Sequence, residues 1–305
     1  MRILRFPNLL IVVFTQYLLQ YAVLIPNFSA VGITPLLDHL HFALFVLSTL
    51  IIAAGGYLIN DIVDLKIDQI NKPEKMWIGK YCSLAQAWQL YLGLSGLGLL
   101  LSLYLALHVG NLSLLLIYPV AVLLLYSYSM YLKKTALWGN LIVAIFCAFV
   151  PMIVLFAERS AYQELQLAAP IRASYCWTLF GAYGVFAFCS TLFREIIKDL
   201  EDIKGDAAQG CKTLPIVAGV SIAKTVAGTI GFLLLTLLVV VAYFHWQQKQ
   251  YLQLGFNLLA IVLPLTGSLW KLTKSDLDKA AYHQLSTLAK LIMLFGLIYL
   301  IIGLL

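Results

Sequence analysis

Long stretches without a charged side chain constrain this chain more than any other feature of its sequence. About 20 apolar residues allow a helix to cross the hydrocarbon core of a membrane. Charge-free stretches of about that length or more cover residues 39–60, 81–132, 135–157, 173–193, 225–248 and 250–270. Asp, Glu, Lys and Arg make up 11% of the 305 residues, whereas a soluble domain has about a quarter. The sequence therefore excludes a water-soluble fold.

These stretches predict an all-α, multi-pass membrane helical bundle of nine transmembrane helices. Residues 81–132 are long enough for two spans joined near Gly110, and Pro7–Ile25 and the tail after Ser286 complete the nine. No small-residue cleavage site follows the first apolar run, Leu9–Val13, so we expect a retained helix rather than a signal peptide. The five cysteines have neither CxxC nor CxxH spacing, which argues against a zinc site or a disulfide framework.

The positive charges test this number of spans, because cytoplasmic loops carry an excess of Lys and Arg. With nine spans, the loops on the N-terminal side hold 17 of the 20 Lys and Arg residues, and the other side holds Arg159, Arg172 and Lys249. We therefore predict that the N-terminus is cytoplasmic. We expect the protein to lie in the cytoplasmic (inner) membrane. The net charge of +6 needs no nucleic-acid partner, since these residues set the orientation and contact anionic lipid. No required protein partner is evident.

Six aspartates form two sets with the same spacing. The first acidic set is Asp61, Asp64 and Asp68, after the second span, and the second acidic set is Asp199, Asp202 and Asp206, after the sixth. Positions i, i+3 and i+7 lie within about 60° of one another on a helix, so each set shares one helical face. The 138 residues from Asp61 to Asp199 suggest two related halves, roughly 1–135 and 136–305, within one integral-membrane domain, 1–305.

Carboxylates gathered in this way need a cation to offset their repulsion. Mg²⁺ prefers one or two carboxylates together with phosphate oxygens, so two opposed acidic faces fit a diphosphate held through shared metal ions. All six aspartates are therefore candidate metal ligands and catalytic residues. Basic side chains nearby are candidates for binding the remaining phosphate charge; they are Lys72, Lys75, Arg194, Lys198, Lys204 and Lys212. Glu195 is expected to pair with a neighbouring Lys or Arg.

The segments NDIVDLKIDQINKP (Asn60–Pro73) and REIIKDLEDIKGD (Arg194–Asp206) resemble the two Asp-rich signatures of the UbiA superfamily of intramembrane prenyltransferases. The opening Arg5 to Asn8, of the form Arg-x-Pro-Asn, and the nine predicted spans extend the resemblance over the whole chain. It implies an apolar central cavity, Mg²⁺ as cofactor, and transfer of an isoprenyl group from a prenyl diphosphate to a lipophilic acceptor. Asn60, Arg5 and Asn8 become candidate substrate-binding residues by position.

Two departures from the family pattern concern phosphate binding. Many relatives have a second Arg-Pro and a Pro-Ser-Gly turn after the first signature, whereas this chain reads NKPEKMWIGK over Asn71–Lys80. The family often has a Tyr and a Lys four residues apart after the fourth span, whereas Tyr128 and Lys133 are five apart. Both are candidate substrate-binding residues, and the alternative is an aromatic belt with a topology-setting lysine.

The second signature resembles the branch that prenylates geranylgeranylglyceryl phosphate in ether-lipid synthesis more than it resembles the branch that prenylates 4-hydroxybenzoate. An aromatic acceptor on a quinone or related route stays open. A divalent-cation transporter with paired acidic sites is the alternative of another class, although transport sites usually lie near mid-membrane and these aspartates begin at the ends of spans. A phosphatidyl-group transferase fits less well, because those enzymes have one Asp-rich motif and fewer spans.

Overall fold

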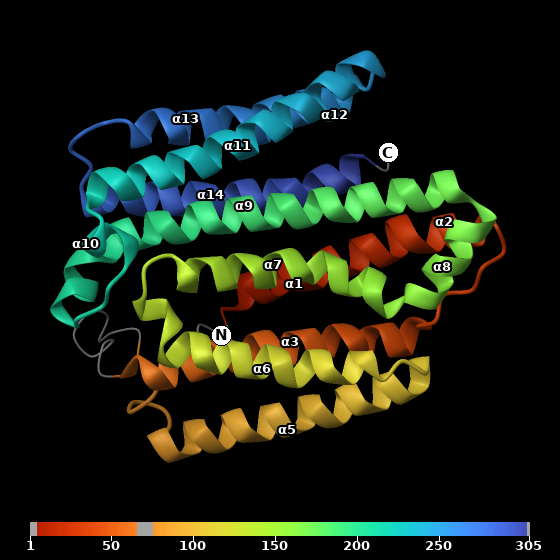
Figure 1. The fold of residues 1–305 in the computed structure, drawn as a ribbon, viewed down its shortest axis with the longest axis horizontal. Helices are drawn as coiled ribbons and strands as arrows, with labels where there is room; N and C mark the ends of the chain where they lie inside the picture. The colour runs from red at the N-terminus through yellow and green to blue at the C-terminus, as the bar shows by residue number, and fades with distance from the viewer. Residues whose placement is uncertain (1–4, 66–75, 304–305) are drawn as a thin grey trace. The chain divides into compact units, whose positions relative to one another are not determined.

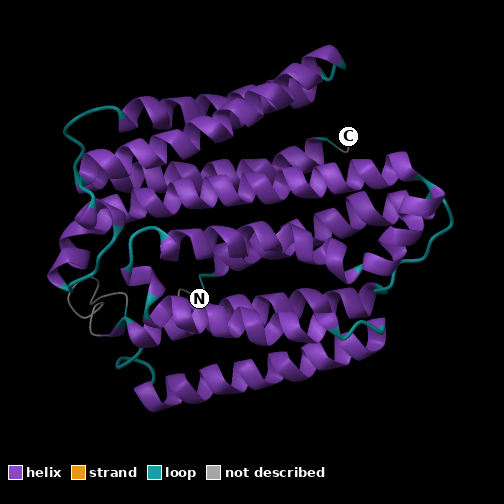
Figure 2. Cartoon of the chain, in the orientation of Figure 1, coloured by secondary structure: helices purple, strands orange, loops and turns teal. Residues whose placement is uncertain are grey.

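The computed structural model describes residues 5–65 and 76–303, which form helices joined by turns with no strand among them (Figure 1, Figure 2). Up to residue 130 the elements are α1 (Phe6–Leu18), a π-helical segment (Leu19–Leu24), α2 (Ile25–Ser29), α3 (His39–Val63), α5 (Leu84–Val109) and α6 (Ser113–Met130). The later helices are α7 (Trp138–Ala157), α8 (Arg159–Ala168), α9 (Pro170–Ala208), α10 (Leu214–Val217), α11 (Val220–Gln247), α12 (Tyr251–Phe256), α13 (Leu263–Leu272) and α14 (Lys279–Ile302). A second π-helical segment, Asn257–Val262, joins α12 to α13.

Within the described ranges, nine helical stretches are long and apolar enough to cross a membrane, which confirms the predicted number. Several of them extend beyond their predicted limits, and the sixth and the last do so the furthest. The sixth was predicted over 173–193, but α9 covers Pro170–Ala208, and the last begins at Lys279 rather than after Ser286. A charge-free stretch marks only the part of a helix that lies in hydrocarbon, whereas the helix itself can continue into the polar region with charged residues on it.

Local sequence explains where several helices begin and end. The Asp38 side chain accepts a hydrogen bond from the backbone N–H of His41 and caps α3. Ser83 and Gln86 form a reciprocal capping box at the start of α5. Gly110 ends α5 with φ of +68°, a left-handed conformation that glycine adopts without steric cost. These caps satisfy backbone groups that a helix leaves unpaired at its ends.

The chain divides into two compact units. Unit 1 comprises Met1–Lys133 with Met152–Thr178, and unit 2 comprises Lys134–Pro151 with Leu179–Leu305. The predicted halves, 1–135 and 136–305, stay a prediction, and the compact units divide the chain differently. The first acidic set belongs to unit 1 and the second acidic set to unit 2, so each set is described within its own unit.

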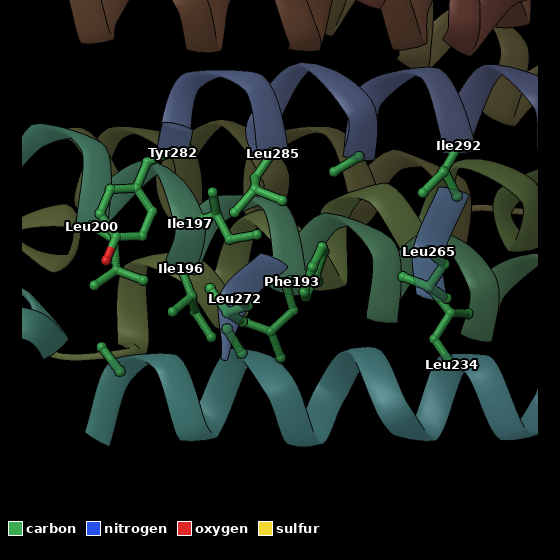
Figure 3. Packing of buried hydrophobic residues seen from close by; sticks show 14 of the residues in the cluster. Phe193, Ile196, Ile197, Leu200, Leu234, Leu265, Leu272, Tyr282, Leu285 and Ile292 are labelled. Carbon is green, nitrogen blue, oxygen red and sulfur yellow. The ribbon is translucent and has the colours of Figure 1, made fainter. Parts of the chain in front are cut away.

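Each unit has an apolar cluster beside its acidic set. In unit 1, Leu58, Ile59 and Ile62 of α3 pack with Ala87 and Tyr91 of α5. In unit 2, the apolar face of α9 packs against α11, α13 and α14, as Figure 3 shows. The labelled side chains of that cluster are Phe193, Ile196, Ile197, Leu200, Leu234, Leu265, Leu272, Tyr282, Leu285 and Ile292. Burial of one face of α3 and of α9 fixes the direction in which their aspartates project.

Candidate active site

The first acidic set lies at the end of α3. Asp61 is on the last turn, between the buried side chains of Ile59 and Ile62. The helix ends at Val63, and Asp64 follows as its C-cap with φ −82° and ψ 2°. The single helical face expected for this set therefore extends only to the helix end, where the Asp64 N–H still bonds to the Asn60 carbonyl at 2.9 Å. Asp68 lies outside the described residues.

Two side chains from other segments contact the carboxylate of Asp61. Arg5 Nη2 lies 3.6 Å from Asp61 Oδ1, and the Trp77 indole Nε1–H donates to Asp61 Oδ2 at 2.9 Å. The Arg5 guanidinium also lies over the Tyr57 ring, 4.7 Å from its centroid. Asn8 donates to the Tyr57 hydroxyl at 3.2 Å. The structure thus brings Arg5 to the first acidic set, and Asn8 to Tyr57, four residues before Asp61.

Asp64 is paired with a lysine from the end of the fourth span. Lys133 Nζ donates to Asp64 Oδ1 and, at 3.2 Å, to Asn60 Oδ1. The Asn60 amide donates in turn to Asp64 Oδ2 at 2.9 Å. Asp64 and Lys133 are 16% and 12% exposed, so the ion pair is largely shielded from solvent. The predicted lysine therefore lies directly at the acidic set, and Tyr128 lies half-buried on α6, five residues before it.

The second acidic set lies on α9 in unit 2. Asp199, Asp202 and Asp206 all fall within this one helix, as their spacing predicts. Ile196, Ile197 and Leu200 of the same helix are buried, and the three aspartates are half-buried. The Asn140 side chain of α7 donates to Asp199 Oδ2 at 2.8 Å. Lys279 Nζ lies 4.0 Å from Asp202 Oδ1.

The predicted basic residues of unit 2 differ in their surroundings. Arg194 contacts Glu195, and Lys198 lies 3.6 Å from Glu195 Oε2, so Glu195 is an ion-pair partner, as expected. Lys204 and Lys212 are exposed. His283 Nδ1 and Glu201 Oε1 are hydrogen-bonded at 2.9 Å. Lys72 and Lys75, predicted to bind phosphate, lie outside the described residues.

The donor set suits a hard divalent cation such as Mg²⁺. Carboxylate and amide oxygens of Asp61, Asp64 and Asn60 are gathered at one helix end, and oxygen ligands are those that Mg²⁺ prefers. No group of three His, Cys, Asp or Glu side chains that could hold a metal ion occurs among the described residues. Mg²⁺ is usually bound by one or two carboxylates together with phosphate oxygens of the substrate. The residues present therefore fit a metal ion that binds together with a phosphate group.

Trp77 and Asn140 were not predicted as site residues. Trp77 follows the first signature by four residues and lies in the segment that departs from the family pattern, so nothing in its sequence position indicates a contact with Asp61. Asn140 carried a usable signal, because it is an amide within the charge-free stretch 135–157, and polar residues in spans usually have a specific partner.

The chain is similar to known proteins over most of its length. A model described as the UbiA prenyltransferase family matches residues 21–295. A digeranylgeranylglyceryl phosphate synthase of Sulfurisphaera tokodaii is 35% identical over 251 residues, which cover 80% of each chain.

Solved structures share the fold. One, from a study of the biosynthesis of digeranylgeranylglyceryl phosphate synthase in membranes, has a TM-score of 0.66 at 24% identity and covers 99% of this chain and 96% of the other. A UbiA homologue from Archaeoglobus fulgidus, bound to GPP and Mg²⁺, has a TM-score of 0.53 at 19% identity, with 98% of each chain covered. At these identities the likeness concerns the fold.

Proposed function

Because the chain belongs to the UbiA prenyltransferase family, we propose that it transfers a geranylgeranyl group from its diphosphate to geranylgeranylglyceryl phosphate, forming an ether lipid. Family membership decides for a multi-pass membrane enzyme over a divalent-cation transporter. The relative from Sulfurisphaera tokodaii, which is similar over most of both chains, supports the choice of acceptor. An aromatic acceptor is the competing outcome of the test below.

The arrangement at the first acidic set is the observation that carries the proposed reaction. The carboxylates of Asp61 and Asp64, the cations of Arg5 and Lys133 and the amide of Asn60 converge at the end of α3. The helix α3 is otherwise mostly apolar. Carboxylates provide ligands for metal ions, and Arg5 and Lys133 provide charge for a diphosphate. A site built from both kinds of group fits a substrate that brings its own phosphate oxygens.

Bound Mg²⁺ would stabilise negative charge on the departing diphosphate and make the allylic carbon electrophilic. The proposed metal ligands are Asp61, Asp64 and Asp68 in unit 1 and Asp199, Asp202 and Asp206 in unit 2, each set within its own unit. Arg5 and Lys133 in unit 1 are the proposed phosphate-binding cations beside the first acidic set, and the basic residues of unit 2 have the same proposed role beside the second. The apolar helices exclude water, which would otherwise compete with the acceptor hydroxyl for the carbon. We further propose that the site opens on the cytoplasmic side of the cytoplasmic membrane.

The test uses the purified protein in liposomes with radiolabelled geranylgeranyl diphosphate, in Mg²⁺ or EDTA, and separate glycerol-phosphate and aromatic acceptors. We expect an ether-linked product that is lost in EDTA. Asp64→Asn and Asp202→Asn should each lower turnover by about 100-fold or more, since each removes a ligand charge that acts on the leaving group.

Two helix-capping aspartates provide matched controls. Asp38→Asn and Asp278→Asn alter the N-caps of α3 and α14, where Asn caps as well as Asp, and both should retain activity. A prenylated aromatic product alone would exclude the ether-lipid acceptor. Full activity in EDTA, or in Asp64→Asn and Asp202→Asn, would exclude the metal-assisted mechanism.

A further inference from the structure

The leading aspartate of each acidic set receives a hydrogen bond from an uncharged N–H on another segment. Trp77 Nε1 donates to Asp61 Oδ2 at 2.9 Å in unit 1. Asn140 Nδ2 donates to Asp199 Oδ2 at 2.8 Å in unit 2. Asp61 and Asp199 hold the same place in the shared spacing, so two units with different local sequences make the same kind of contact at the same position.

The turn that carries Trp77 is held in a defined conformation. Gly79 has φ of +87° and donates to the Cys82 carbonyl at 2.7 Å, and the Tyr81 N–H bonds to the Trp77 carbonyl at 2.8 Å. Ile78 is 3% exposed and belongs to the apolar cluster of α3 and α5, against which Trp77 also packs. The indole is thus held from two sides, by the turn and by the cluster, and its N–H is directed at Asp61.

Asn140 is held from the start of α7. Asn140 is 7% exposed and is the third residue of the helix, after Trp138 and Gly139. A buried amide without a partner costs free energy, and its Nδ2 has a partner in Asp199. The contact therefore joins α7 to α9 and fixes the orientation of one carboxylate oxygen of the second acidic set.

Neutral donors and cations have different effects on a metal-binding carboxylate. A lysine or arginine offsets the charge of the carboxylate and competes with the metal ion. An uncharged N–H restrains one oxygen and leaves the negative charge available. Such outer partners orient ligands in metal sites, and their loss typically weakens metal affinity or activity by about 10- to 100-fold. Trp77 and Asn140 have the position and the chemistry for this role.

We propose that Trp77 and Asn140 are positioning residues: within its own unit, Trp77 orients Asp61 and Asn140 orients Asp199 for divalent cations that bind together with diphosphate. The inference rests on the proposed function, because it assumes that these aspartates are metal ligands. Trp77 lies in the segment where this chain departs from the family pattern. This segment has neither the second Arg-Pro nor the Pro-Ser-Gly turn of many relatives. We infer that the Trp77 indole orients the first acidic set from this segment instead.

The experiment measures metal binding without turnover. Mn²⁺ is titrated into the full-length protein in detergent with inorganic diphosphate, and free Mn²⁺ is followed by electron paramagnetic resonance. Trp77→Phe keeps the aromatic packing and removes the N–H, and Asn140→Leu removes the amide at similar volume. We expect each to raise the Mn²⁺ Kd about tenfold or more. Asn140→Ala provides a second variant without added bulk.

Matched controls remove the same groups elsewhere in the same units. Trp88→Phe changes a second tryptophan packed on the unit 1 cluster, and Asn257→Leu removes a buried amide that donates to the Leu238 carbonyl. Both should leave the Mn²⁺ Kd within twofold of the wild-type value. Assays with geranylgeranyl diphosphate should show the half-saturating Mg²⁺ concentration of the Trp77 and Asn140 variants raised in parallel.

The outcomes separate this inference from the proposed function. A Kd within twofold of wild type in Trp77→Phe and the Asn140 variants overturns the inference, even if their activity or melting temperature falls, because a packing role alone predicts that pattern. Wild-type protein that forms no prenylated product, with Mn²⁺ binding weakened in the variants, refutes the proposed reaction and supports the positioning role.

Discussion

Glu158 is a fully buried acid between α7 and α8, in unit 1. Its Oε2 accepts from the Leu36 N–H at 2.7 Å, and its Oε1 accepts from Gln20 Nε2 at 2.8 Å and from the Leu37 N–H at 3.2 Å. One carboxylate thus fixes the segment before α3, whose backbone donors have no helical partner. Its role is structural, because these three donors satisfy a carboxylate buried at the end of an apolar helix.

Burial raises the pKa of the Glu158 carboxyl above its ordinary value, against the opposing effect of the donors at Leu36, Gln20 and Leu37. A raised pKa means that the folded chain binds the proton more tightly than the unfolded chain. The contribution of Glu158 to stability is therefore fully present below the ordinary Glu pKa and is lost as the pH rises through the folded value. We expect the apparent Tm of wild type to fall across this window more than that of Glu158→Gln, measured by fluorescence in detergent.

Equal pH dependence in wild type and Glu158→Gln would contradict this assignment. Glu158→Ala serves as the companion variant, because it leaves three buried donors without their acceptor. Each such donor costs about 1–3 kcal/mol, so Glu158→Ala should melt below wild type at every pH.

At the scale of the elements, α5 and α6 approach closely at one glycine. A Cβ built on Gly98 of α5 would overlap the Tyr118 ring and hydroxyl of α6. The Tyr118 hydroxyl donates to the Leu94 carbonyl at 3.3 Å, which holds the ring against α5. Small residues allow such close approach between helices in membranes.

Gly98→Ala should therefore destabilise the protein. Overpacking costs about 1–3 kcal/mol, which exceeds the gain of about 0.5–1 kcal/mol from replacing a helical glycine. The measurement is the apparent Tm in detergent, with Gly93→Ala and Gly96→Ala of the same helix as controls, because a Cβ there meets nothing within 4 Å. Gly98→Ala combined with Tyr118→Leu should recover part of the loss, and a Gly98→Ala protein as stable as its controls would refute the packing account.

At the scale of the whole molecule, the nine helical stretches of the described residues that are long and apolar enough to cross a membrane predict that the two termini lie on opposite sides of it. Positive charges predict that the N-terminal side is cytoplasmic. We expect Gln248→Cys, between α11 and α12, to react in intact cells with a membrane-impermeant maleimide. Ser275→Cys, between α13 and α14, should react only after permeabilisation. The unsubstituted protein gives the background from its five native cysteines, and the reverse labelling pattern would invert the predicted orientation.

The type of the secondary-structure elements and the positions of most of them could be predicted from the sequence. A membrane requires long apolar helices and leaves few other options for the backbone. The part of the chain that the structure describes contains nine helical stretches long and apolar enough to cross a membrane, as that argument predicts. The ends of α3 and α9 did not follow, since Asp64 caps α3 while α9 continues through Asp199, Asp202 and Asp206. Carboxylates at helical spacing occur in both settings, and the spacing alone does not tell where a helix ends.

The sequence by itself determined the membrane class, the number of spans and the six aspartates, because hydrophobic length and repeated spacing are local properties of the chain. Only the tertiary structure showed that Lys133 pairs with Asp64, that Arg5 and Trp77 meet at Asp61, and that Asn140 bonds to Asp199. The two residues of each contact are 16 to 69 positions apart in the sequence. Which side chain meets which aspartate depends on how helices pack, and packing is decided by the shapes of all the side chains between them.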